Sequence, residues 1–198
     1  MTILLTTDKA QLRVHGNGFL QAVTSLGKIH VWDNRLPRQK VPSTIHNHNH
    51  GFMSQIMIGG LHMTEYTLWC PPIADTVYIP HQCVPRKGKD TLLEPSGPPV
   101  ATTNRREFWL EQGSEYTFPL NMRLYHQVEP VYKHERMVIT RVTGIPSIGN
   151  EKELPTVLVR EGCEPDNDFD RYTFDDIARV VYEDAVTLLC ERKLGFRG

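Results

Sequence analysis

Short runs of alternating apolar and polar residues fill the first two thirds of the chain, and Gly, Pro and Asn separate them. Alternation with a period of two is typical of β-strands with one buried face, because successive side chains point to opposite faces. Many short strands separated by turns favour a β-sandwich or β-barrel over a parallel α/β sheet. The predicted strands cover residues 18–24, 28–32, 43–50, 53–58, 62–68, 75–79, 106–110, 115–118 and 137–142.

Two segments depart from this pattern. Residues 84–103 are rich in Pro, Gly and Lys, which predicts a long loop or lid between two halves of the β domain. From Thr173 onward the period becomes helical, with Thr173 as the predicted cap. We therefore expect a β domain over residues 1–160, and an acidic linker and C-terminal helix over residues 161–198. The predicted apolar stripe of this helix, which would pack on the barrel or on a partner chain, contains Ile177, Val180, Val181, Leu188 and Leu189.

The net charge and the spacing of the cysteines indicate which partners and which cellular compartment the sequence favours. Twenty-two Lys and Arg residues nearly balance 23 Asp and Glu, leaving a net charge of −1. Nucleic-acid binding needs clustered basic residues, so this balance argues against such a partner. The four cysteines form no Cys-x-x-Cys pair, which is typical of reduced cytoplasmic thiols. No apolar run approaches the roughly 18 residues of a membrane span. We expect a cytoplasmic protein with a small-molecule partner and no membrane contact.

Three closely spaced histidines are the clearest chemical signal. His46, His48 and His50 follow one another at intervals of two, so in an extended segment their imidazoles share one face. Asn47 and Asn49 would then point to the other face. Neutral imidazole is a common nitrogen ligand of Fe, Zn, Cu and Ni, so the spacing favours a metal site.

The remaining ligand must come from a distant part of the chain. His126 lies among apolar residues at period two and is expected to face the interior, whereas His134 lies in a polar stretch. We therefore predict His126 as the third ligand beside His46 and His48. The pair His48 and His50 stays open as an alternative to His46 and His48. Further candidates for an additional ligand, or for a hydrogen-bond partner of a ligand, are His50, Gln55, His62 and His134.

The histidine segment resembles the first conserved motif of the cupins. His46-x-His48 is followed by Ser54 and by Gly59-Gly60, and further along Gly113 and Pro119 resemble the opening of the second cupin motif. Two positions depart from the family pattern. Phe52 or Met53 stands where many cupins have a metal-binding glutamate. Asn121 replaces a glycine, and the interval from Pro119 to His126 is two residues longer than in the motif.

This resemblance implies an all-β, cupin-like double-stranded β-helix (jelly roll) with an added C-terminal α-helix. A site without the glutamate is similar to that of three-histidine thiol dioxygenases such as cysteine dioxygenase. It implies a mononuclear Fe(II) dioxygenase for a small thiol or carboxylate substrate, with Arg106 and Arg123 as candidate substrate-binding residues. Zn, Ni or Mn would instead support an isomerase or hydrolase. A non-catalytic binding or structural protein is the other alternative, and cupins often form homodimers.

Overall fold

Thirteen strands and one helix make up the part of the chain that the computed structural model describes. That part comprises residues 12–15, 17–24, 27–36, 45–69, 76–86, 89–119, 123–144, 153–164, 170–171 and 176–192. The elements are β1 (Leu12–His15), β2 (Phe19–Thr24), β3 (Gly27–Asp33), β4 (Phe52–Ile58), β5 (Gly60–Trp69), β6 (Tyr78–Arg86), β7 (Lys89–Pro95), β8 (Ala101–Glu111), β9 (Glu115–Phe118), β10 (Tyr125–Val131), β11 (Met137–Gly144), β12 (Thr156–Arg160), β13 (Asp170–Arg171) and α1 (Asp176–Glu191).

The strands form one large sheet and two smaller ones. The seven-stranded sheet has the order β13-β1-β2-β3-β11-β4-β9, and the smaller sheets have the orders β10-β5-β8 and β12-β6-β7. His46 forms isolated antiparallel bridges with His126 of β10 and with Val157 of β12. The backbone at His46 therefore joins the two smaller sheets. This junction matters for function, because it places one member of the histidine cluster between β10 and β12.

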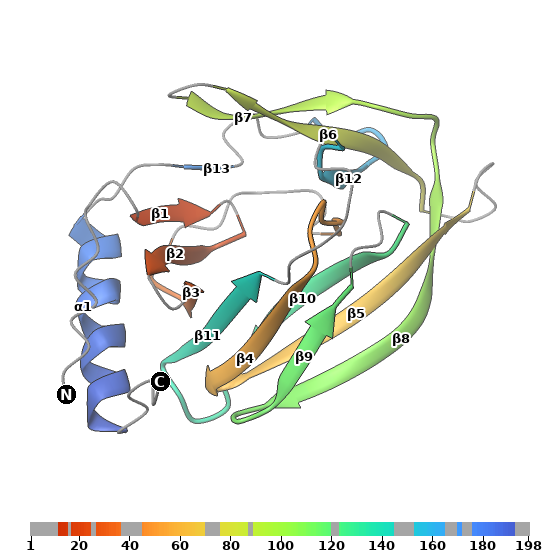
Figure 1. Cartoon of the computed structure of the whole chain (residues 1–198). Helices are drawn as coiled ribbons and strands as arrows, with labels where there is room; N and C mark the ends of the chain where they lie inside the picture. Colours follow the sequence, from red (N-terminus) through yellow and green to blue (C-terminus); the bar gives the residue numbers. More distant parts are fainter. Residues whose placement is uncertain are drawn as a thin grey trace.

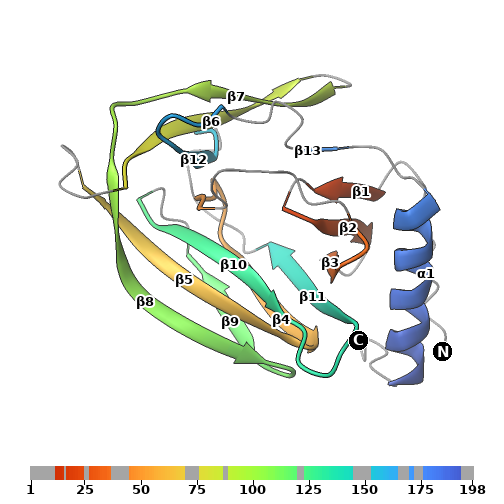
Figure 2. The same cartoon turned by 180° about the vertical axis from the view of Figure 1, so that it is seen from behind.

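The sheets are arranged as two facing layers. In Figure 1, β11, β4 and β9 lie in front of β10, β5 and β8, and Figure 2 shows the same layers from behind. The β6–β7 hairpin and β12 lie at the top of both views, and α1 stands beside β1, β2 and β3. The fold is thus mostly β with one C-terminal helix. A two-layer β-rich architecture of this kind is compatible with a cupin-like sandwich.

The side chains of β1, β2 and β3 alternate between two faces of the sheet, one packed against α1 and the other facing a cavity. Their apolar residues on one face, including Leu20 and Val31, pack with α1 in a single core cluster. Their residues on the other face, which are largely polar, line an interior cavity. The helix therefore covers the outer face of this part of the sheet and leaves the inner face for the cavity. The inner-face residues are Arg13, His15, Phe19, Gln21, Lys28, His30 and Trp32.

Helix α1 packs through small residues as well as large ones. Its buried positions are Ala178, Val181, Ala185 and Leu189, at intervals of three and four residues. The prediction that Ile177 and Val180 belong to the buried stripe is wrong, since they are 49% and 43% exposed. The alanines let the helix lie close to the sheet, and a prediction based on large apolar residues overlooks them. No helix in the described ranges is long and apolar enough to cross a membrane.

The structure also differs from three segment predictions. Within residues 45–50 there is no regular strand, only the bridge at His46. Residues 84–103 are not a structureless loop, because they include the end of β6, all of β7 and the start of β8. The predicted linker contributes β13, which pairs with β1 at the edge of the large sheet. Thr173 and Asn121 lie outside the described residues. The bridge at His46, the start of β8 and β13 depend on pairing with strands distant in the sequence, whereas β7 forms a hairpin with the adjacent β6; local composition does not report either kind of pairing.

Candidate metal centre

Three histidines meet where the segment after Ile45 crosses β10. The backbone N–H of His46 donates to the carbonyl of His126 at 2.9 Å, and the reciprocal bond is 2.8 Å. The Nε2 atoms of His48 and His126 are 2.8 Å apart. The His46 ring centroid lies 4.8 Å from that of His48 and 4.6 Å from that of His126. One ring nitrogen from each histidine lies within 4.8 Å of the others, so the group could hold a metal ion.

Asn47 holds the segment so that its two histidine neighbours point to the same side. Asn47 is buried, its backbone N–H donates to the carbonyl of Thr156, and its Oδ1 accepts from the N–H of Thr156 at 2.6 Å. The Asn47 side chain therefore faces the backbone of β12, while His46 and His48 both line the cavity. The predicted orientation is confirmed for Asn47, but Asn49 lines the cavity together with His48 and His50, so the prediction for Asn49 is wrong. The orientation of Asn47 arises from bridges to β10 and β12, and not from a regular strand.

The cavity beside the histidines has a volume of about 390 Å³. That volume lies within the range of about 300–1,000 Å³ found for small-molecule sites. Aromatic residues form part of its wall: Phe19, Trp32, Phe52 and Tyr116. Pro85 and Thr91 from the β6–β7 hairpin also line it. The segment predicted as a lid thus contributes to the cavity wall as an ordered hairpin.

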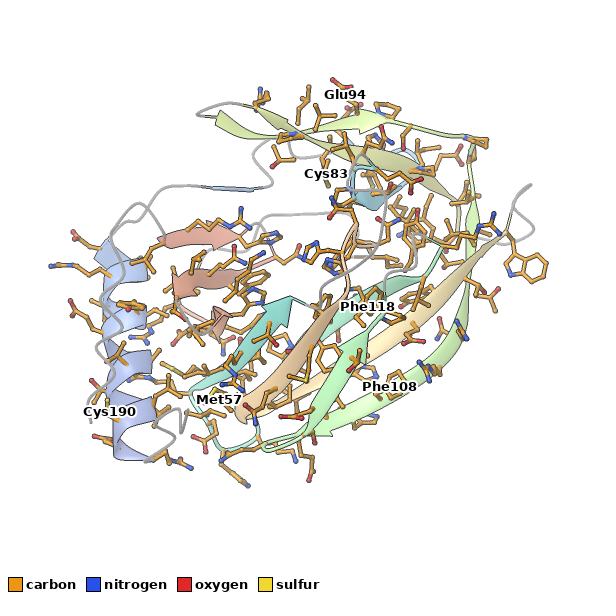
Figure 3. The ribbon with its side chains drawn as sticks, in the orientation of Figure 1. Met57, Cys83, Glu94, Phe108, Phe118 and Cys190 are labelled. Atoms are coloured by element: carbon orange, nitrogen blue, oxygen red, sulfur yellow. The ribbon has the colours of Figure 1, made fainter. Side chains whose placement is uncertain are left out.

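Two phenylalanine rings pack against the imidazoles of His48 and His126. Phe118 is fully buried, and its ring centroid lies 4.3 Å from that of His126 and 5.4 Å from that of His48. Phe52 stacks on Phe118 at 5.4 Å and lies 4.8 Å from His48. Figure 3 shows Phe118 in the interior between the sheets and Cys83 on the inner side of β6. Phe52, which with Met53 is one of the two residues compared with the glutamate of many cupins, therefore places an aromatic ring beside the histidines.

Burial favours the neutral form of two of the clustered imidazoles, His48 and His126. It lowers the pKa of His48 and of His126 well below 6.5, and the neighbouring His46 lowers both further. With both rings neutral, one Nε2–H of the close pair donates to the lone pair of the other. Among the residues that the structure describes, none is a hydrogen-bond partner of the buried Nδ1 of His126. The Nε2 atoms of His48 and His126 thus share one hydrogen bond. A bound cation would take the place of the shared proton and accept a lone pair from each nitrogen.

The donor set fits a borderline transition metal. Metal–imidazole bonds are about 2.0–2.1 Å long, so two nitrogens at right angles on one ion lie about 3 Å apart. The 2.8 Å between Nε2 of His48 and Nε2 of His126 is close to that separation. Three imidazoles without a carboxylate suit Fe, Zn, Ni or Cu better than Mg or Ca, which prefer oxygen ligands. The residues present therefore fit a metal of this class.

Of the four further candidate ligands, one lies at the cavity and three lie elsewhere. His50 lines the cavity, and its ring centroid lies 5.8 Å from that of His48. Gln55 does not line it, because it shares the alternate face of β4 with Met57, which packs towards α1. His62 lies on the outer face of β5 and stacks on the exposed Trp109 at 4.2 Å. His134 is exposed in the turn after β10. The structure gathers His46, His48 and His126.

The predicted substrate arginines lie outside the cavity. Arg106 forms an ion pair with the buried Glu65 at 2.6 Å, and its side chain is 55% exposed. Arg123 is exposed, and neither residue lines the cavity. Within the described ranges, the Lys and Arg residues that line it are Arg13 and Lys28, which the sequence reasoning missed. The available signal was the alternation of polar and apolar residues along β1–β3, which leaves polar side chains on an inward face.

No family model, curated protein or solved structure that we compared with the chain matches it. Fold and site alone therefore define its class: a mostly β protein with a cluster of three histidines that could hold a metal ion.

Proposed function

We propose that the protein is a mononuclear cupin-type metalloenzyme, in which His46, His48 and His126 hold Fe(II) and a small substrate is oxidised by dioxygen. The observation that carries the proposal is the close group of three ring nitrogens at the wall of a cavity of about 390 Å³. A site with only three protein ligands leaves coordination positions for other molecules. The cavity supplies the space in which substrate and dioxygen would occupy them.

The protein's own residues have three tasks in this proposal. His48 and His126 provide neutral lone pairs, because burial disfavours their protonation, and His46 is the third ligand. Phe52 and Phe118 pack against these rings and hold their orientation. The aromatic wall excludes water from the apolar part of a substrate and strengthens polar contacts at its other end. Bound Fe(II) would supply the redox and Lewis-acid chemistry that these side chains lack.

Three neutral ligands also influence the substrate. They do not neutralise a divalent ion, so the site keeps its full positive charge and favours an anionic substrate. A thiolate or an enolate fits this description, because a nearby cation lowers the pKa of such a group. A carboxylate ligand would have weakened the effect, and Phe52 or Met53 stands at the motif position where many cupins supply one.

The decisive experiment measures metal content and oxygen uptake together. We would purify the untagged protein, reconstitute it with Fe(II) under anaerobic conditions, and count metal by mass spectrometry. The variants His48→Ala and His126→Ala would be compared with His134→Ala, whose histidine is exposed outside the cavity. We expect about one iron per chain in the wild type and in His134→Ala, and a large loss in the other two. Circular dichroism would establish that each variant is folded, with His46→Gln as a milder substitute for any variant that is not.

Oxygen uptake with a panel of small thiols and carboxylic acids then separates the chemistries. Uptake that depends on iron and is lost in His48→Ala supports the dioxygenase. One zinc or nickel per chain without oxygen uptake overturns it in favour of non-oxidative metal chemistry. Absence of metal after reconstitution overturns any metalloenzyme and leaves a binding protein.

A further inference from the structure

The part of the cavity wall formed by β1, β2 and β3 carries two basic side chains. Arg13 of β1 and Lys28 of β3 both line the cavity. Among the described residues that line it, none is an aspartate or a glutamate. Positive charge at a cavity wall attracts anions and disfavours cations. The two basic side chains therefore make an anion the favoured ligand of this wall.

The two histidines of this wall are fixed as hydrogen-bond donors. The backbone N–H of Asn17 donates to Nδ1 of His15 at 3.2 Å, so the neutral ring of His15 carries its proton on Nε2. Nε of Arg13 donates to Oε1 of Gln21, which leaves the amide nitrogen of Gln21 facing Nε2 of His30 at 2.9 Å. That amide nitrogen can only donate, so the proton of His30 is on Nδ1. The unprotonated nitrogen of each ring thus accepts a hydrogen bond from a neighbouring group of the protein.

Packing and charge place these groups close together. Phe19 stacks on His15 at 4.5 Å and lies 4.6 Å from His30, which holds both rings against β2. Burial lowers the pKa of His30 to about 3, and the charges of Lys28 and Arg13 lower it further. Both cations are therefore near enough to His30 to act on it electrostatically. They leave it neutral, so it can donate through one N–H without adding a charge.

We propose that the wall formed by Arg13, Lys28, His15 and His30 binds the anionic group of the substrate, a carboxylate or a phosphate. The apolar part of this substrate lies against the aromatic wall, and its reactive end faces the three histidines. The assignment of this ligand as substrate rests on the proposed function, whereas binding of the anion itself requires no metal. Two cations and two imidazole N–H groups are complementary to oxygen acceptors and repel a cationic ligand.

The test uses three probes of similar shape on protein freed of metal with EDTA. Benzoate and phenyl phosphate carry the two anionic groups, and benzamide is the neutral counterpart of benzoate. Isothermal titration calorimetry would compare the wild type with Arg13→Met and Lys28→Met. Arg106→Met is the matched control, because Arg106 is a cation on β8 outside the cavity. Thermal unfolding of each variant would establish that it is folded, and Arg13→Lys would show whether charge alone restores binding.

We expect at least one anion to bind at least about tenfold more tightly than benzamide, as for a charge-assisted hydrogen bond. Arg13→Met and Lys28→Met should each weaken that anion about tenfold, and Arg106→Met should not. The comparison of benzoate with phenyl phosphate identifies the preferred group. Equal binding of benzamide, or no binding of either anion, would overturn the proposal. So would binding that needs added metal and is unaffected in Arg13→Met. Protein that binds benzoate but never takes up metal would refute the enzyme and keep this site.

Discussion

Mild acid should destabilise the metal-free protein, because several cavity histidines are buried in their neutral form. Burial lowers the pKa of His15, His30, His48 and His126, and neighbouring charged or imidazole groups lower each further. In the unfolded chain the same groups titrate near 6.5. The unfolded state therefore binds more protons below that pH. The resulting stability is fully present above pH 6.5 and is lost as the pH falls towards the folded values, which for His30 is about 3.

The size of the effect follows from linkage. At pH 5.5 an unfolded histidine with a pKa of 6.5 is almost fully protonated, which favours unfolding by about 1.4 kcal/mol for each group that stays neutral when folded. Four such groups together cost about 5.6 kcal/mol, which is comparable to the whole stability of many domains. His30 alone accounts for about a quarter of this change in the same treatment.

Urea unfolding followed by circular dichroism at pH 7.5 and 5.5, on EDTA-treated protein, measures this dependence. His30→Gln keeps a side-chain acceptor for Gln21 but cannot be protonated. It should reduce the change in unfolding free energy between the two pH values by about 1.4 kcal/mol. His134→Gln, at an exposed position, should keep the wild-type dependence. An unfolding free energy that is the same at pH 7.5 and 5.5, or a His30→Gln variant with unchanged pH dependence, would refute the reasoning.

Two further substitutions test the packing around the site. Asp33→Asn removes a buried carboxylate that accepts three hydrogen bonds from Arg35, and should lower the unfolding free energy by about 2 kcal/mol. Burial raises the pKa of Asp33, but the hydrogen bonds from Arg35 lower it by more, so the folded pKa lies below the usual value of 3.8. The loss of unfolding free energy in Asp33→Asn, measured by urea unfolding, should therefore become smaller as the pH falls below 3.8. Phe118→Ala should cost about 3–5 kcal/mol and weaken metal retention at His126, with Phe118→Leu much milder. Unchanged metal content in a destabilised Phe118→Ala would contradict the supporting role of that ring.

Much of the β architecture could be predicted because strand alternation is a local property. The run at residues 115–118 coincides with β9, and the predicted strand at 28–32 lies within β3. His126 could be predicted as an interior residue because its apolar neighbours follow a period of two, and it is 2% exposed. Such patterns survive folding, since successive side chains on an extended backbone point to opposite faces whatever the partner strand is.

Local sequence determined that Asn47 separates two histidines on one side, but tertiary structure decided what that side faces. His46 reaches His126 only because its backbone bridges β10, eighty residues further along the chain. Likewise, alternation in β1 separates Arg13 from Leu12, but only the packing of α1 over Leu12 makes the Arg13 face the interior. Arg106 on β8 has the same chemistry and is bound to Glu65 outside the cavity. Periodicity determines which side chains share a face. Which face is covered and which encloses a site depends on contacts between distant segments, and no local pattern contains them.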